Sequence, residues 1–161
     1  MLFLCTRNSA RSQIAEALLT YKAERLRTDR YVAGSAGASP ATAVHPRALA
    51  ALRARGIEWG AASPKSIDAV AGTPWDLIIT VCDRAKETCP VFPGKPIFAH
   101  WGMSDPAEAT GDDAAIRRAF DTTLTYLSRR IDLLLALPFE SLEQSAFELR
   151  VQQIARDVPA P

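Results

Sequence analysis

The sequence predicts one α/β domain built on an open, parallel, four-stranded sheet with helices on both faces. Short apolar runs alternate along the chain with segments of helical periodicity, which is the pattern of parallel strands joined by crossover helices. The length of 161 residues corresponds to about one domain. A content of 48% hydrophobic and 23% charged residues is typical of a chain that buries a globular core.

Four short segments have the composition of strands: 2–4, 31–33, 76–81 and 95–98. The first ends at Cys5. The third is almost wholly apolar, which is typical of a strand buried on both faces, and it ends at Cys82. The second is expected to run into a turn at 34–37, where the sequence is Gly-Ser-Ala-Gly.

Apolar residues at helical spacing predict four helices: 12–25, 45–55, 112–137 and 142–154. Ser12 is expected at the amino end of the first helix. Pro46 near the start and Gly56 just past the end bound the second. The segment 63–71 is predicted as a short helix or a loop.

Charge, hydropathy and cysteine content narrow the class of protein. Lys+Arg is 19 and Asp+Glu is 18, so no overall field would recruit nucleic acid or an anionic membrane. The longest apolar stretch, 131–139, is too short to span a bilayer, and residues 1–12 lack the features of a secretory signal. Three cysteines do not make a disulfide framework. We therefore expect a soluble cytoplasmic protein that holds any anion at a local site.

The carboxyl ends of the predicted strands locate that site. In an open parallel sheet, ligands bind beyond the carboxyl ends of the strands. Cys5, Cys82 and the loop after Phe98 are all expected at this edge. Three distant segments of the chain should therefore converge on one crevice.

The loop that follows Cys5 has the features of an oxyanion site. It runs between a strand and a helix, so its backbone amides and the helix amino end can surround an anion. Arg11 can grip a tetrahedral oxyanion with two parallel hydrogen bonds. The same positive field favours the thiolate of Cys5, which is the nucleophilic form. The predicted oxyanion-binding residues are Thr6, Arg7, Asn8, Ser9, Ala10 and Arg11. The alternative is that Cys5 is only a buried thiol at a strand end.

Two further motifs carry possible chemistry. Cys82 and Cys89 flank one loop, and they could form a relay of thiols, be two structural thiols, or contribute to a zinc site with His45 or His100. Asp105, in the sequence Ser-Asp-Pro, could protonate a leaving oxygen, although Asp-Pro is also a common turn.

These motifs resemble the low-molecular-weight tyrosine phosphatase superfamily, and within it the thioredoxin-coupled arsenate reductases. The resemblance is carried by CTRNSARSQIAEALL at 5–19, GSAG at 34–37, HP at 45–46, ITVCDRAKETCP at 79–90 and HWGMSDPA at 100–107. It implies a phosphatase-like fold and a domain spanning 1–137. The remainder, 138–161, has no clear counterpart and is expected to be a helical extension packed on the same domain.

The resemblance also implies a mechanism in which arsenate is reduced to arsenite for arsenic detoxification. Cys5 would attack arsenate, Ser12 would hydrogen-bond the thiolate, and Asp105 would protonate the departing oxygen. Cys82 would then attack Cys5 and release arsenite, and Cys89 would take over the disulfide for thioredoxin to reduce. The segment 83–88 must move for these exchanges, and phosphate should compete with arsenate. No cofactor, metal, nucleic acid or membrane partner is implied, and we expect a monomer.

The residues leave two alternative functions open. A tyrosine or small-molecule phosphatase would use Cys5, Arg11 and Asp105 in the same way. Such phosphatases typically carry Pro at the position of Gln13 and an aromatic residue at that of Ala107, and they have no need of thiols at 82 and 89. A non-catalytic redox or oxyanion sensor is the third hypothesis, and glutaredoxin is an alternative reductant.

Some reductases of this family bind a potassium ion near the loop. Asn8, Glu16 and Ser35 match the residues that bind it, but Lys65 falls where the family has Asp. We expect the ammonium group of Lys65 to replace the ion.

Overall fold

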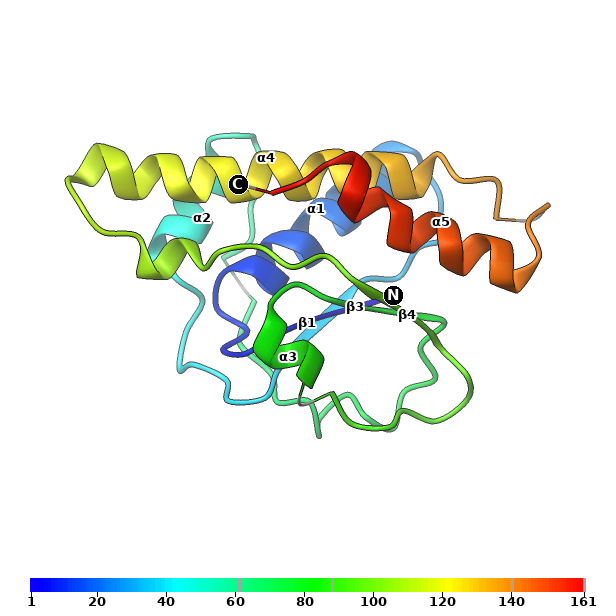
Figure 1. The fold of residues 1–161 in the computed structure, drawn as a ribbon. Helices are drawn as coiled ribbons and strands as arrows, with labels where there is room; N and C mark the ends of the chain where they lie inside the picture. The colour runs from blue at the N-terminus through cyan, green and yellow to red at the C-terminus, as the bar shows by residue number, and fades with distance from the viewer. Residues whose placement is uncertain (61, 88, 140, 161) are drawn as a thin grey trace.

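The computed structural model describes residues 1–60, 62–87, 89–139 and 141–160. At its centre is a parallel sheet of four strands in the order β2-β1-β3-β4 (Figure 1). The strands are β1 (Leu2–Cys5), β2 (Gly34–Gly37), β3 (Leu77–Thr80) and β4 (Ile97–His100). This sheet with its helical connections confirms the predicted fold class.

The helices in the described residues are α1 (Arg11–Arg25), α2 (Pro46–Arg53), α3 (Asp83–Glu87), α4 (Asp113–Leu135), α5 (Gln144–Asp157) and the short 3-10 helix η1 (Pro106–Glu108). Figure 1 shows α1 between α4 and the sheet, with α3 on the opposite side of the sheet from α4. α5 packs against β4 and α4, and α3 packs against β1 and β3. The four long predicted helices are therefore present, and each is shifted at its ends by no more than a few residues. The segment 63–71 is a loop that makes an isolated bridge to β2 through Ser66.

The position of the second strand differs from the prediction. We expected a strand at 31–33 and a turn at 34–37, but Gly34–Gly37 itself is the strand. A Cβ atom on Gly34 would lie 2.5 Å from the ring of Trp75, and one on Gly37 would lie 2.7 Å from the carbonyl oxygen of Thr6. Small residues are therefore required by close packing on the strand, and this requirement overrides their low intrinsic β-propensity.

The last strand is also displaced, covering Ile97–His100 where 95–98 was expected. The register pairs Thr80 of β3 with His100 of β4, and Cys5 of β1 with Gly37 of β2. The strand ends that carry Cys5, Cys82 and the segment after β4 therefore share one edge. No helix within the described ranges has the length and apolar character needed to cross a membrane.

Candidate active site

The loop between β1 and α1 is held from outside by the segment that follows β2. Three of its carbonyl groups accept backbone hydrogen bonds from this segment: Thr6 from Ser39 (2.8 Å), Arg7 from Ala41 (2.9 Å) and Ser9 from His45 (2.8 Å). Asn8 adopts a left-handed conformation with φ 47°, which turns the chain sharply at the middle of the loop. With its carbonyl groups engaged outward, the loop can direct amide groups toward its centre.

The sulfur of Cys5 lies at that centre and is almost fully buried. It accepts a hydrogen bond from the backbone N–H of Asn8 at 3.1 Å and lies 2.9 Å from the hydroxyl oxygen of Ser12. α1 begins at Arg11, so the positive end of its dipole faces the same region. Ser12 lies at the amino end of this helix, as expected. Its hydroxyl contacts the sulfur, and no side chain caps α1.

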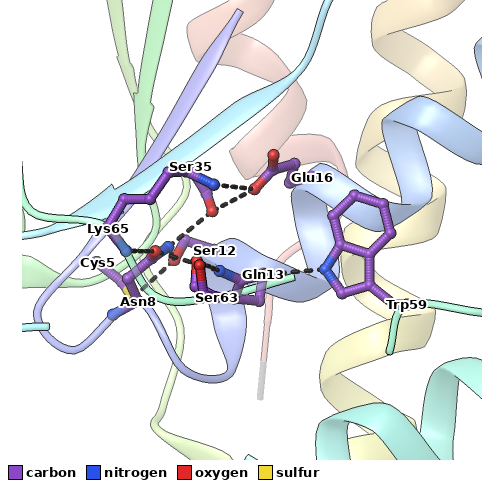
Figure 2. Close-up of polar contacts among 9 residues, drawn as sticks. All are labelled: Cys5, Asn8, Ser12, Gln13, Glu16, Ser35, Trp59, Ser63 and Lys65. Atoms are coloured by element: carbon purple, nitrogen blue, oxygen red, sulfur yellow. Dashed lines mark hydrogen bonds and ion pairs between the residues drawn. The ribbon is translucent and has the colours of Figure 1, made fainter. Parts of the chain in front are cut away.

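A chain of hydrogen bonds determines which way the Ser12 hydroxyl points (Figure 2). Ser35 donates its only hydroxyl hydrogen to the carboxylate of Glu16 at 2.5 Å, so its oxygen must accept the bond from the side-chain amide of Asn8 at 2.7 Å. The second hydrogen of that amide goes to the Ser12 oxygen at 2.8 Å. The Ser12 hydrogen is therefore available to donate to Cys5, which favours a thiolate as its acceptor.

The orientation of the Asn8 amide is fixed by its oxygen. That oxygen accepts from the backbone N–H of Lys65 at 2.7 Å and from the side chain of Gln13 at 3.2 Å. Gln13 is itself held by the indole N–H of Trp59 at 2.8 Å. The ammonium group of Lys65 lies 3.5 Å from the Glu16 carboxylate, on the side of the network away from Cys5 (Figure 2).

Cys82 lies against the same loop. It lies two residues after the end of β3, is 5% exposed, and its sulfur lies 3.4 Å from the hydroxyl oxygen of Thr6. A hydroxyl group at that distance can donate to a thiolate. The second predicted thiol is thus in contact with the residue that follows Cys5 in the chain.

Cys89 lies farther along, beyond α3, in a different environment. Its side chain is half-buried, and burial raises the pKa of its thiol. It lines a cavity of about 520 Å³ together with His100 of β4 and with Gln152 and Arg156 of α5. The three cysteines therefore differ in surroundings: Cys5 and Cys82 have polar contacts at the loop, and burial disfavours the thiolate of Cys89.

Arg11 and Asp105 meet although 94 positions separate them in the sequence. The guanidinium donates from Nη2 to Oδ2 of Asp105 at 2.5 Å and from Nη1 to the carbonyl of Met103 at 2.9 Å. The other carboxylate oxygen of Asp105 accepts from the backbone N–H of Ala107 and caps η1. The buried Nε of Arg11 has no hydrogen-bond partner among the described residues.

The remaining loop residues differ in exposure. Arg7 is exposed to solvent, whereas Ser9 and Ala10 are buried. Sequence reasoning left open whether the charge of Arg7 lies near the anion site or in solvent, and its exposure favours solvent. For the zinc alternative, the described part of the chain contains no group of three or more His, Cys, Asp and Glu side chains able to hold a metal ion.

Sequence reasoning missed a polar chain beside Cys82. His100 contacts the hydroxyl of Thr80 through Nδ1 at 2.8 Å and the carboxylate of Asp83 through Nε2 at 3.0 Å. A Cβ atom on Gly102 would lie 2.5 Å from Nε2 of His100, so this glycine makes room for the ring. The sequence signal was the short stretch His-Trp-Gly, but nothing in it indicated that Asp83 was the partner.

The chain is similar to several proteins that are named arsenate reductases. An arsenate reductase of Halalkalibacterium halodurans is 37% identical over 123 residues, covering 74% of this chain and 85% of its own. The crystal structure of an arsenate reductase from Archaeoglobus fulgidus is 30% identical with a TM-score of 0.61, and the match covers 81% of this chain and 98% of that one. A thioredoxin-dependent arsenate reductase from Corynebacterium glutamicum is 32% identical with a TM-score of 0.55, over 82% of this chain and 61% of that one.

The family comparison covers most of the chain. Residues 1–147 match the family described as low molecular weight phosphotyrosine protein phosphatase. The matched range includes the Cys5 loop, both further cysteines and Asp105. The chain therefore belongs to the low molecular weight phosphotyrosine protein phosphatase family.

Proposed function

We propose that this protein reduces arsenate to arsenite through a relay of three thiols, with thioredoxin as the final reductant. The observation that carries the proposal is the contact of the Cys82 sulfur with Thr6 at 3.4 Å, because it puts a second thiol against the loop that holds Cys5. A phosphatase needs only the first thiol, since water opens its cysteinyl-phosphate. The names of the similar proteins support the same reaction.

In the first step, the loop amides and Arg11 hold the arsenate, and the thiolate of Cys5 attacks arsenic. A sulfur–arsenic bond forms and an arsenic–oxygen bond breaks, with Asp105 as the group that protonates the departing oxygen. The hydrogen bonds from Asn8 and Ser12 favour the thiolate before the attack. Arsenic is still pentavalent in this adduct.

The reduction takes place in the second step. The thiolate of Cys82 attacks the sulfur of Cys5, and the electron pair of the sulfur–arsenic bond leaves with arsenic, which departs as arsenite. Cys89 then attacks Cys82, releasing Cys5 as a thiolate and leaving a Cys82–Cys89 disulfide. Two electrons and two protons from the thioredoxin dithiol restore both thiols. Each turnover therefore consumes one reduced thioredoxin for each arsenate.

The surroundings of Cys89 support a fixed order in which the three cysteines react. Burial raises the pKa of its thiol, so it is a poor nucleophile while α3 holds its folded position. α3 has only five residues, Asp83–Glu87, and it joins the two cysteines of the last disulfide. Movement of this helix would both expose Cys89 and bring it toward Cys82. We infer that Cys89 becomes reactive only after Cys82 has reacted.

The test follows NADPH oxidation with purified protein, thioredoxin, thioredoxin reductase and arsenate. We expect sustained turnover that phosphate inhibits, because arsenate and phosphate share shape and charge. Cys82→Ser should abolish this turnover and leave hydrolysis of p-nitrophenyl phosphate intact, whereas Cys5→Ser should abolish both. Wild-type protein that hydrolyses the ester without consuming NADPH would favour the phosphatase alternative. Turnover with glutaredoxin and glutathione, but not with thioredoxin, would show that glutaredoxin is the reductant.

We place this activity in the cytoplasm, because the relay starts from reduced thiols and thioredoxin keeps thiols reduced in that compartment. The monomeric state stays a prediction, and so does the division of the chain into a domain at 1–137 and an extension at 138–161.

A further inference from the structure

Trp101 follows β4 directly and is fully buried. Each of its polar groups bonds a different element. Its backbone N–H donates to the carbonyl of Thr80 at 2.8 Å, its indole N–H donates to the carbonyl of Val151 in α5 at 3.1 Å, and its own carbonyl accepts from Arg130 at 2.7 Å. Trp101 is therefore fixed from three sides at the point where the chain turns toward Asp105.

Arg130 is the unusual member of this group. It projects from α4 with only 1% of its surface exposed, and burial lowers the pKa of its guanidinium. No carboxylate of the described residues lies within ion-pair distance, and the charge is held by two carbonyl groups, those of Trp101 and of Val158 at the end of α5 (3.0 Å). A buried charge held only by dipoles is costly compared with an apolar side chain of the same size. Simple packing would therefore favour a residue such as Met or Leu at position 130.

The segment that Trp101 begins carries two of the groups that bind Arg11. They are the carbonyl of Met103 and the carboxylate of Asp105. Only three residues separate Trp101 from Asp105, so a displacement of the Trp101 carbonyl is transmitted along a short length of chain. Arg130 acts at the start of this segment without touching Arg11 or the loop.

We propose that Arg130 is a positioning residue for the reaction. With Trp101 and the carbonyl groups of α5, it holds the segment 102–105 so that Asp105 meets the oxygen that leaves arsenic. The proposal rests on the proposed function, in which Asp105 is the proton donor. Val151 and Val158 both lie beyond residue 147, where the family match ends. The C-terminal helix is therefore part of the support of the active site.

The first experiment compares Arg130→Met with Arg129→Met, which removes an exposed guanidinium from the same turn of α4. Arsenite formation is measured in a single turnover with enzyme in excess, and amide hydrogen exchange is measured across 102–105. We expect Arg130→Met to slow arsenite formation by roughly ten- to a hundredfold, the range for a misplaced catalytic group, and to speed exchange in this segment. Arg129→Met should change neither. An unchanged single-turnover rate in Arg130→Met would overturn the proposal.

The second experiment separates positioning from general damage to the fold. If Arg130 acts through Asp105, Arg130→Met should slow arsenite formation by less than about twofold when Asp105→Asn is already present, because coupled effects are not additive. Equal losses in both backgrounds would overturn the proposal. Should Arg130→Met fail to fold, Trp101→Phe replaces it in both comparisons, because it removes the indole N–H bonded to Val151 together with part of the buried ring. A wild-type protein without arsenate turnover would refute the proposed function. The hydrogen-exchange comparison would still test whether Arg130 holds the segment 102–105 in place.

Discussion

Gly37 is the position where the structure constrains the active-site loop most directly. A Cβ atom there would lie 2.7 Å from the carbonyl oxygen of Thr6 and 2.8 Å from the backbone nitrogen of Asn8. Both neighbours are backbone atoms, so neither can rotate away as a flexible side chain would. Gly37→Ala must therefore displace either the loop or β2.

The expected magnitudes follow from these contacts. Forcing a methyl group into closely packed structure costs roughly 1–3 kcal/mol of the free energy of unfolding. If the loop yields, the Asn8 N–H moves away from the Cys5 sulfur, to which it now donates at 3.1 Å. A hydrogen bond to a charged group contributes about 1.5–3 kcal/mol. At about 1.36 kcal/mol for each factor of ten in rate, alkylation of Cys5 at a fixed neutral pH should slow by roughly ten- to a hundredfold.

The matched control is Gly72→Ala. A Cβ atom on Gly72 meets nothing within 4 Å, and its backbone conformation does not require glycine. Both substitutions are made in a protein that also carries Cys82→Ser and Cys89→Ser, so that iodoacetamide reports on Cys5 alone. Gly72→Ala should leave the alkylation rate unchanged and the free energy of unfolding unchanged or slightly raised. The reasoning would be refuted if Gly37→Ala gave the same alkylation rate and the same free energy of unfolding as Gly72→Ala.

Three further predictions concern charged and titrating groups. Lys65→Met leaves the Glu16 carboxylate without the ammonium group 3.5 Å away. Because the Lys65 side chain is 36% exposed, we expect urea titration to show a loss of only about 1–2 kcal/mol in the free energy of unfolding. The wild-type protein should turn over equally in potassium and in sodium at the same ionic strength. Burial lowers the pKa of His45, whose Nδ1 accepts the N–H of Arg47 and so must be unprotonated. The contribution of His45 to stability is therefore present above about pH 6.5 and is lost as the pH falls. His45→Asn keeps a capping acceptor, and urea titrations at pH 7.5 and 5.5 should show a smaller pH dependence of stability for this variant than for the wild type. Burial raises the pKa of the Cys89 thiol, so the contribution of this thiol to stability is present below its ordinary pKa of 9.0 and is lost as the pH rises. Cys89→Ser should therefore reduce the fall in stability between about pH 8 and pH 10. An equal fall in the variant and in the wild type would contradict this.

Much of the architecture could be predicted because periodicity is a local property of the sequence. The run that contains Leu77–Thr80 is almost wholly apolar, and the stripe along Asp113–Leu135 recurs at helical spacing, so both elements could be identified from residue types alone. The prediction misplaced β2 because tertiary packing, and not local β-propensity, determines the residue types of this strand. Trp75 and the Cys5 loop exclude side chains at Gly34 and Gly37, and both lie far from β2 in the sequence. A contact of this kind leaves no periodic signal.

The site divides in the same way. Cys5, Arg11 and the loop between them follow one another in the chain, so their chemistry could be predicted from spacing. The pairing of Arg11 with Asp105 was expected only in outline, from the rule that strand ends share one edge. Arg130 lies beside the apolar stripe of α4, three residues after Leu127 and four before Leu134, whereas Arg129 lies on the opposite face. Periodicity could therefore indicate that Arg130 faces the core, but nothing in the sequence indicated which carbonyl groups it binds.

In the proposed mechanism, the ion pair between Arg11 and Asp105 links substrate binding to proton transfer. An ion pair with Arg11 requires the carboxylate form of Asp105, whereas protonation of a leaving oxygen requires the carboxylic acid. An arsenate dianion in the loop competes for the same guanidinium through two oxygens, and a bidentate contact to a doubly charged anion is stronger than one to a single carboxylate. When Arg11 turns to the oxyanion, it releases the carboxyl group of Asp105, which can then hydrogen-bond the oxygen that leaves arsenic. The same movement that binds the substrate therefore prepares the acid, provided that the segment 102–105 holds Asp105 in place while its partner leaves. That requirement gives the buried charge of Arg130 a reason to be retained.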